Sequence, residues 1–361
     1  MRFHLSFAAT WLLAISDLTW AAPFNITDTI RLPIPPIRWP ICTLPPPTPK
    51  LMRITHDELI KRISPFMPGF DPKGISNNTG FRPPKLNFTR IPETRLTRDI
   101  HLKQFLTIAP RSTQLFIHSQ VLDVTRKAFP YSTMGKVFLR DGTGRVGHCT
   151  GTSVGHNLLL TANHCVPWDS PPDRKWTMEF VPGYDGLAEP ASDAKPFGSA
   201  FAVYCVGVDD EVIDGRDYAL CKLNSNIGET DIGWLRWKAS GDDAFYYNGD
   251  WSSVGYPYTF RDGNVPTTDS APVKIEKVNN DGTDGKVLMS APYVEQGWSG
   301  GPLFGYVGDP DEEEYGPWIV GVVSASVSMS FYEHIFADYT FHAAGVRMGQ
   351  LIEWGWKEWI N

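Results

Sequence analysis

Three short segments of the chain present a serine, a histidine and an aspartate in settings that suit nucleophilic catalysis. Ser299 stands among glycines in Gly297-Trp-Ser-Gly-Gly-Pro302. Glycine lets the backbone turn sharply and approach a ligand closely. The amides of Gly297 and Ser299 are therefore candidates for the hole that stabilises a tetrahedral oxyanion. Taken alone, the same segment is also compatible with a Gly/Ser turn between two strands.

His164 follows an apolar run in Leu158-Leu-Leu-Thr-Ala-Asn-His-Cys165. A serine hydroxyl is a poor nucleophile at neutral pH and needs a base whose pKa is close to the working pH, which imidazole provides. The alternative is a surface histidine beside a structural disulfide. We interpret His148 and His156 as nearby histidines of that second kind.

Asp217 opens the run Asp-Tyr-Ala-Leu-Cys-Lys-Leu223. A buried carboxylate fixes the tautomer of a catalytic imidazole, and an aspartate at the start of an apolar strand suits that role. A turn residue that caps the strand is the alternative. The rival acids Asp209, Asp210 and Asp214 lie in a polar turn and are expected to be solvated. The order histidine, aspartate, serine matches one known arrangement of a catalytic triad.

These residues would be positioned by many short strands. From about Phe129 onward, β-branched or alternating runs are bounded by Gly, Pro, Asp and Asn, which predicts an all-β barrel or sandwich. The runs are Lys136–Arg140, Leu158–Thr161, Trp176–Val181, Phe201–Val206, Trp318–Val323 and Phe336–Thr340. A single amphipathic helix is predicted at the C-terminus, where Val346, Leu351, Ile352, Trp354 and Trp356 are spaced for one face.

The N-terminal part has a different character. Residues 1–21 resemble a secretory signal peptide, with Arg2 before an apolar run too short to span a bilayer; an N-terminal anchor is the alternative. Residues 22–49 contain nine prolines and are expected to be extended. We therefore predict a signal peptide at 1–21, a Pro-rich pro-region or linker at 22–127, and one catalytic domain at 128–361.

Several features fit export of the mature chain. Three sequons begin at Asn25, Asn77 and Asn87, and they are candidate glycosylation sites. The pair Lys61-Arg62 is either a processing site or two solvated cations. No other segment reaches membrane-spanning length. A net charge of −7 gives no reason to expect a nucleic acid partner.

Cysteine usage also bears on the compartment. Four of the five cysteines form an even set in the second part of the chain, whereas Cys42 stands alone. Export permits disulfides. We expect the mature chain to be secreted.

From about Pro130 to the C-terminus, the sequence resembles the trypsin-like (chymotrypsin-fold) serine proteases, and within them most nearly the secreted glutamyl-endopeptidase-like branch. Thr161-Ala-Asn-His-Cys165 is similar to Thr-Ala-Ala-His-Cys, and Gly297–Pro302 to Gly-Asp-Ser-Gly-Gly-Pro. Further similar segments are Phe129-Pro-Tyr-Ser-Thr-Met-Gly135, Phe180-Val-Pro-Gly-Tyr184, Asp217-Tyr-Ala-Leu220 and Val254-Gly-Tyr-Pro257. The resemblance implies a double β-barrel with the active site between the barrels.

The resemblance also implies a bridge between Cys149 and Cys165. For Cys205 and Cys221 we infer a pairing between neighbouring strands of the same barrel. By the same resemblance, Ser324 is expected to hydrogen-bond the buried Asp217.

Departures from the family pattern concern activation and specificity. Trp298 stands where trypsin has the aspartate that pairs with a new N-terminal amine, so we expect no such switch and a pro-region that inhibits the enzyme or assists folding by another route. Tyr293 replaces the aspartate that selects Lys and Arg, and Val323 replaces the histidine of glutamyl endopeptidases. The candidate substrate-pocket residues are Tyr293, Val294, Val323 and Ser324. His342 is interpreted as a core or surface histidine.

The sequence is compatible with more than one function. The leading one, which the resemblance implies, is a secreted, monomeric serine endopeptidase that forms an acyl-enzyme with polypeptide substrates through His164, Asp217 and Ser299 and needs no metal or cofactor. The alternative is a catalytically silent binding protein on a protease scaffold, in which Trp298 distorts the oxyanion loop. An esterase or lipase would need the order serine, acid, histidine, which this chain lacks.

Overall fold

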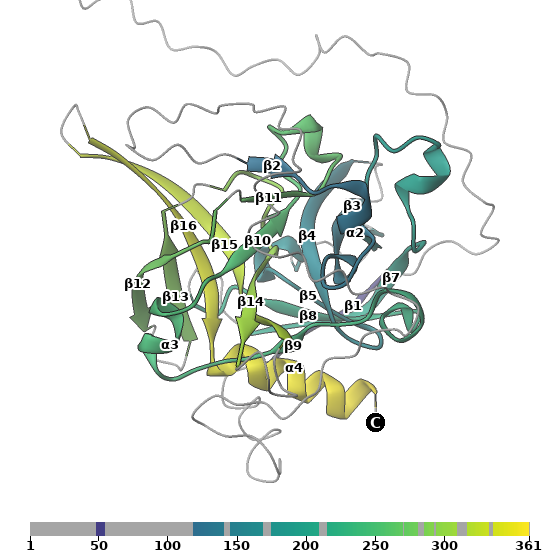
Figure 1. Ribbon diagram of the computed structural model, residues 1–361. Helices are drawn as coiled ribbons and strands as arrows, with labels where there is room; N and C mark the ends of the chain where they lie inside the picture. The colour runs from purple at the N-terminus through teal and green to yellow at the C-terminus, as the bar shows by residue number, and fades with distance from the viewer. Residues whose placement is uncertain are drawn as a thin grey trace, which may run out of the picture. The chain divides into compact units, whose positions relative to one another are not determined.

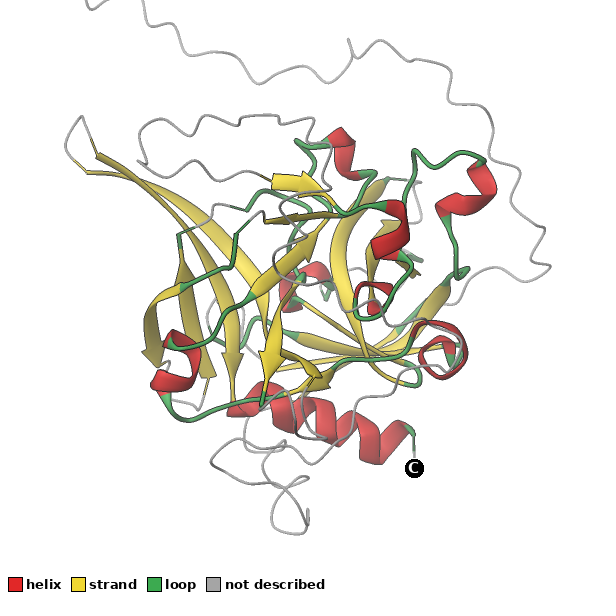
Figure 2. Ribbon diagram, in the orientation of Figure 1, coloured by secondary structure: helices red, strands yellow, loops and turns green. Residues whose placement is uncertain are grey.

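Short strands bounded by turn residues build two β-sheet units in the computed structural model (Figures 1 and 2). The structure describes residues 48–54, 118–140, 145–168, 175–208, 215–269, 271–280, 285–291, 294–308, 316–331 and 335–360. The predicted signal peptide, the three sequons and the Lys61-Arg62 pair lie outside these residues. All described residues belong to one compact domain.

The first unit is a closed barrel of six strands. Its strands are joined in the ring β3-β4-β5-β8-β7-β6, and β6 pairs again with β3. Alternating side chains of Val137, Leu159 and Phe180 fill its interior together with a disulfide between β7 and β8. The strands are β3 (Met134–Arg140), β4 (Val146–Gly155), β5 (Leu158–Thr161), β6 (Thr177–Pro182), β7 (Ala200–Val208) and β8 (Ala219–Leu223).

The second unit is antiparallel in the order β12-β13-β16-β15-β14-β10. An antiparallel bridge between Trp251, directly before β10, and Val273, two residues before β12, brings the two ends of this sheet together. The strands are β10 (Ser252–Gly255), β12 (Ile275–Asn280), β13 (Gly285–Ser290), β14 (Pro302–Val307), β15 (Gly316–Phe331) and β16 (Ile335–Gly345). The far ends of β15 and β16 extend from it as a two-stranded arm (Figure 1).

Shorter elements surround the two units. β11 pairs with β10 and with β2, and β9 pairs in parallel with β15. These strands are β2 (His118–Gln120), β9 (Arg236–Trp237) and β11 (Thr267–Asp269). The short helical segments are α2 (Asp123–Arg126), α3 (Asp243–Tyr247), η2 (Tyr131–Thr133), η3 (Asn163–Cys165), η4 (Ala191–Ala194), η5 (Gly228–Ile232) and η6 (Arg261–Gly263).

The C-terminal helix α4 (Val346–Trp359) joins the two units. It follows β16 directly, yet its apolar face packs with Leu158 and Leu220 of the first unit and with Ile319 of the second unit. The indole of Trp356 donates a hydrogen bond to the carbonyl of Val154 over 2.9 Å. The helix therefore holds the two sheets in a common core, and a deletion of it would expose apolar surface of both.

The all-β architecture and the C-terminal helix that the sequence predicted are confirmed. Each of the six predicted runs coincides with a strand, except that Trp176 precedes β6, and β15 and β16 are longer than predicted. Two strand pairings were not predicted. β1 (Lys50–Ile54) pairs in parallel with β7, and β2 pairs with β11. Both strands fall in the range assigned to a pro-region, whose boundaries stay a prediction.

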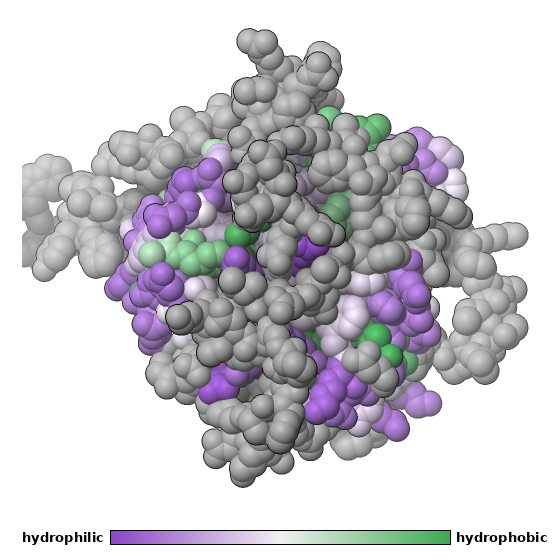
Figure 3. Space-filling model, turned by 60° about the horizontal axis from the view of Figure 1, so that its bottom comes forward, coloured by the Kyte–Doolittle hydropathy of each residue, from purple (hydrophilic) through white to green (hydrophobic). Residues whose placement is uncertain are grey.

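The described surface is mixed in character. Figure 3 shows polar areas separated by smaller apolar ones on one face. Among the described residues, no helix combines the length and the apolar character needed to cross a membrane.

Candidate active site

The pairing of β5 with β8 determines where His164 and Asp217 lie. Thr161, the last residue of β5, is opposite Ala219, the first residue of β8. His164 lies three residues beyond that point, in η3, and Asp217 lies two residues before it. The two segments therefore meet at one end of the barrel, and His164 Nδ1 lies 2.7 Å from Asp217 Oδ2.

The Asp217 carboxylate is enclosed and well satisfied. Its residue is only 3% exposed, and a buried carboxylate must be compensated by hydrogen bonds or a charge. Oδ1 accepts from the backbone N–H of His164 over 3.0 Å, and Oδ2 accepts from the hydroxyl of Ser324 over 2.5 Å. These contacts fix the carboxylate, which in turn orients the imidazole.

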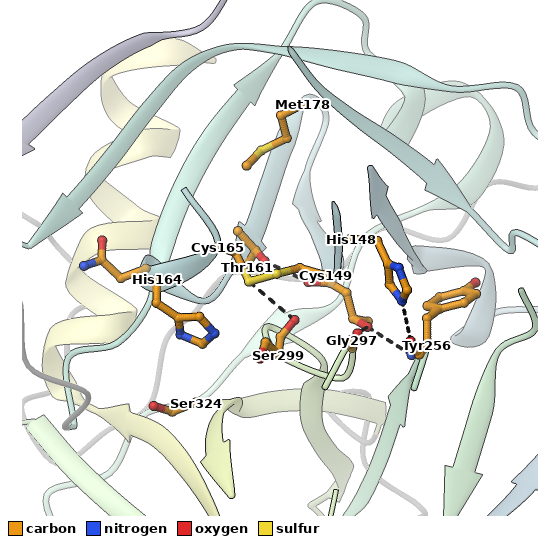
Figure 4. Close-up of a disulfide and its surroundings, with 12 residues drawn as sticks. His148, Cys149, Thr161, His164, Cys165, Met178, Tyr256, Gly297, Ser299 and Ser324 are labelled. Carbon is orange, nitrogen blue, oxygen red and sulfur yellow. Dashed lines mark hydrogen bonds between the residues drawn. A yellow bond between two sulfur atoms is a disulfide. The ribbon is translucent and has the colours of Figure 1, made fainter. Parts of the chain in front are cut away.

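The imidazole itself remains accessible, since 36% of the His164 side chain is exposed. With Nδ1 on the aspartate, the other ring nitrogen is directed away from it. In Figure 4 the ring of His164 points toward Ser299, which lies on the loop from the other sheet. His164 and Asp217 thus come from the first unit, whereas Ser299 and Ser324 come from the second unit.

A disulfide closes the base of the histidine turn. Cys149 of β4 and Cys165 of η3 are bonded, with their Cα atoms 6.3 Å apart (Figure 4). Cys205 and Cys221 are directly opposite each other on β7 and β8 and form the second disulfide. Both expected pairings are confirmed.

The loop around Ser299 has backbone geometry that requires glycine. Gly297 has φ +98° and Gly300 has φ +79°, values that residues with a Cβ rarely adopt. A Cβ on Gly297 would also lie 2.3 Å from the carbonyl oxygen of Tyr256. Gly297 and Gly300 are therefore needed for the turn itself.

Two peptide groups of this loop are held by their carbonyls. Gln296 O accepts from Tyr258 N over 2.9 Å, and Trp298 O accepts from Gly301 N over 2.8 Å. In a planar trans peptide the N–H points opposite to the carbonyl. The N–H groups that share these two peptides belong to Gly297 and Ser299, so both are directed away from the pinned oxygens.

Thr150 of β4 ties the loop to the first barrel. Its N–H donates to Ser299 O over 2.8 Å, and its hydroxyl donates to Gly297 O over 2.8 Å. The same hydroxyl accepts from Tyr256 N over 3.2 Å. One threonine thus contacts the carbonyls on both sides of Trp298, and nothing in the sequence had identified it.

His148 is buried behind this loop, which corrects the prediction that it is a surface histidine. It is 9% exposed, and its Nε2 lies 2.6 Å from Tyr256 O. Burial, followed by the nearby Lys136 cation, lowers the His148 pKa to about 4. The neutral ring donates from Nε2 to Tyr256 O and packs 3.9 Å from the Tyr258 ring, centroid to centroid. Its immediate sequence contains no signal that distinguishes it from an exposed histidine.

The candidate pocket residues are only partly brought together. Val294 and Val323 are buried against Trp298, while Ser324 is directed to Asp217. Tyr293 lies outside the described residues. His342, opposite Val323 on β16, is a core histidine whose Nε2 lies 2.9 Å from Ser290 Oγ. Burial lowers the His342 pKa to about 3. Within the described residues, no three His, Cys, Asp or Glu side chains are grouped to hold a metal ion.

Part of the chain matches a known protein family. Residues 149–309 match the family model described as a trypsin-like peptidase domain, which confirms the resemblance for that segment. The matched segment contains the positions of His164, Asp217 and Ser299. No curated protein matches the chain.

Three solved structures are similar at low identity. A Glu endopeptidase in complex with MPD has 18% identity and a TM-score of 0.47, covering 67% of this chain and 97% of its own. The thermostable serine protease AL20 from an extremophilic microorganism has 17% identity and a TM-score of 0.45, with 64% and 98% coverage. The protease Anisep from Arthrobacter nicotinovorans has 18% identity and a TM-score of 0.42, with 62% and 95% coverage.

Proposed function

We propose that this chain, which contains a trypsin-like peptidase domain, is a secreted serine endopeptidase that hydrolyses peptide bonds through an acyl-enzyme. The observation that carries the proposal is the pair formed by His164 Nδ1 and the buried Asp217 Oδ2, 2.7 Å apart, beside the glycine-rich loop that carries Ser299. The resemblance is carried by specific motifs at all three positions, and the family match spans them.

In the proposed reaction, Ser299 Oγ attacks the carbonyl carbon of the scissile peptide, and His164 Nε2 takes the hydroxyl proton. Asp217 stays ionised and stabilises the imidazolium. The tetrahedral intermediate collapses when His164 gives the proton to the leaving amine, which departs as the C-terminal product. Water then attacks the acyl-enzyme by the same route and releases the acid and free Ser299.

The oxyanion of each tetrahedral intermediate would be bound by the N–H groups of Gly297 and Ser299. Both belong to peptides whose carbonyls are held on the opposite side, by Tyr258 N and Gly301 N. Donors that are fixed before the reaction stabilise developing charge without reorganisation, and one such donor contributes about 100- to 1,000-fold in kcat.

The alternative, a silent binding protein, depended on distortion of this loop by Trp298. The indole is fully buried, its N–H donates to Ser253 Oγ over 2.9 Å, and it packs with Val294 and Val323. Because the Trp298 side chain packs in the core, it leaves the turn of the loop intact. This packing supports the enzyme over the binding protein.

Secretion is part of the proposal. Two disulfides lie in the described domain, and disulfides form and persist in oxidising compartments such as the extracellular space. They agree with the signal-like residues 1–21.

The proposal is tested by comparing cleavage of denatured casein by the wild type, Ser299→Ala and Ser225→Ala. Ser225 is exposed and follows β8 at the end opposite to Asp217, so it controls for a serine substitution as such. We expect Ser299→Ala to lose at least about 1,000-fold in kcat with unchanged circular dichroism, and Ser225→Ala to match the wild type. Wild-type rates in folded Ser299→Ala would exclude Ser299 as the nucleophile.

A further inference from the structure

The side chain of Trp298 lies entirely inside the second sheet unit, although its backbone forms the nucleophile loop. It has no exposed surface and packs between Val294 and Val323. Its Nε1–H donates to the hydroxyl of Ser253, a buried residue of β10, over 2.9 Å. The indole is thus fixed both by apolar contact and by one directional bond.

Two glycines make the space that the indole occupies. A Cβ on Gly255 of β10 would lie 2.2 Å from Trp298 Cγ, and a Cβ on Gly301 would lie 2.8 Å from Trp298 Cδ1. Neither distance is compatible with ordinary packing, so any side chain at Gly255 must displace the indole.

Trp298 is also the residue between the two proposed oxyanion donors. Its N–H donates to Glu295 O over 3.1 Å, and its own carbonyl accepts from Gly301 N over 2.8 Å. The adjoining N–H groups belong to Gly297 and Ser299. A rotation of either adjoining peptide would have to move the indole or break one of these bonds.

The chemistry of an indole excludes one other way of holding the loop. Tryptophan offers a single hydrogen-bond donor and no acceptor, and Ser253 already takes that donor. A charged N-terminal amine at this position would find neither a carboxylate nor another acceptor on the side chain of residue 298. The burial of Trp298 replaces such an ion pair as the anchor.

We propose that Trp298 is a positioning residue, whose buried indole holds the oxyanion loop in its working geometry without an ion pair to an N-terminal amine. The inference rests on the proposed function, since it concerns the same loop. In this role, Trp298 does not touch the substrate but keeps the loop formed.

The test uses the uncut chain that follows the signal peptide, with its intact mass checked before and after each assay. Gly255→Ala introduces a methyl group into the indole site, whereas Gly147→Ala, on β4, places the same group where nothing lies within 4 Å. For Gly255→Ala we expect kcat to fall at least about 100-fold, the size of losing one oxyanion donor, with KM changed less than threefold. Gly147→Ala should stay within twofold of the wild type.

A second readout separates positioning from general damage. A peptide aldehyde forms a tetrahedral adduct with the nucleophile and uses the oxyanion donors, whereas the corresponding peptide amide does not form one. We expect Gly255→Ala to weaken aldehyde binding in parallel with kcat/KM and to leave amide binding unchanged. If Gly255→Ala does not fold, Ser253→Ala, which removes the indole bond with little change in volume, should show the same selective loss at about tenfold.

The inference is overturned if Gly255→Ala is as active as Gly147→Ala. It is also overturned if aldehyde and amide binding weaken equally. These results differ from a failure of the proposed function, which would appear as full activity in Ser299→Ala.

Discussion

The hydroxyl of Ser324 donates to Asp217 Oδ2 over 2.5 Å, and this is the same oxygen that faces His164 Nδ1. Ser324 belongs to β15 of the second unit, whereas Asp217 precedes β8 of the first. The carboxylate that orients the proposed base is therefore held by both units at once. The relative position of the two sheets is part of the catalytic geometry.

Asp217→Asn should preserve the fold and lower kcat by about 10,000-fold, because an amide no longer selects the required imidazole tautomer. The measurement is kcat on a peptide substrate together with a urea melt. Ser324→Ala, which removes only the added hydrogen bond, should show a much smaller loss. Equal losses in the two variants would contradict the role assigned to the Asp217 carboxylate.

The two disulfides provide a matched pair, since both close loops with a sequence separation of 16. Replacing either pair by serines should lower the free energy of unfolding by about 3 kcal/mol. Only Cys149→Ser with Cys165→Ser should also lower kcat, because that bridge borders His164, whereas Cys205 and Cys221 are already aligned by the β7–β8 ladder. Urea melts and kcat at a temperature where both variants are folded would check this. Unchanged kcat in the first variant would show that the bridge does not position His164.

Thr150→Val should lower both stability and activity. The substitution keeps the shape but removes the hydroxyl that donates to Gly297 O and accepts from Tyr256 N, which costs about 1–3 kcal/mol for buried groups left unpaired. We expect kcat to fall by about tenfold as the loop loses this tie.

Thr152→Val, two residues along β4, is the control. The Thr152 hydroxyl is buried and has no hydrogen-bond partner in the structure, so valine should be neutral or slightly stabilising. Urea melts and peptide hydrolysis on both variants give the comparison. Equal stability and activity of the two variants would contradict the role of Thr150 in holding the loop.

Much of this arrangement could be predicted from sequence because its causes are local. Turn residues bound the apolar runs, and the predicted run Leu158–Thr161 coincides with β5. The bond between Ser324 and Asp217 was expected from the family resemblance. Contacts between distant strands were not predictable in this way: burial of His148, the two bonds of Thr150 and the pairing of β1 with β7 depend on registers that no local pattern encodes.

Stability should depend on pH through His342. Its pKa is about 3 in the folded chain and close to 6.5 when unfolded, so the unfolded chain binds the proton more tightly. The stability it contributes is complete above pH 6.5 and is lost as the pH falls toward 3. Between pH 7.5 and 5 this amounts to about 2 kcal/mol.

His342→Gln should therefore reduce the fall in unfolding free energy between pH 7.5 and 5 by about 2 kcal/mol, because glutamine does not titrate and can still hydrogen-bond to Ser290. Guanidinium melts at the two pH values measure the difference. An identical fall in wild type and variant would show that His342 is not the titrating group.

The proposed nucleophile is tested most directly by the site at which a fluorophosphonate reacts with the protein. We expect one adduct per chain by intact mass, located by peptide mapping on Ser299, with slow labelling in His164→Gln and none in Ser299→Ala. Labelling of another residue, or a folded protein that cleaves peptides without being labelled, would contradict it.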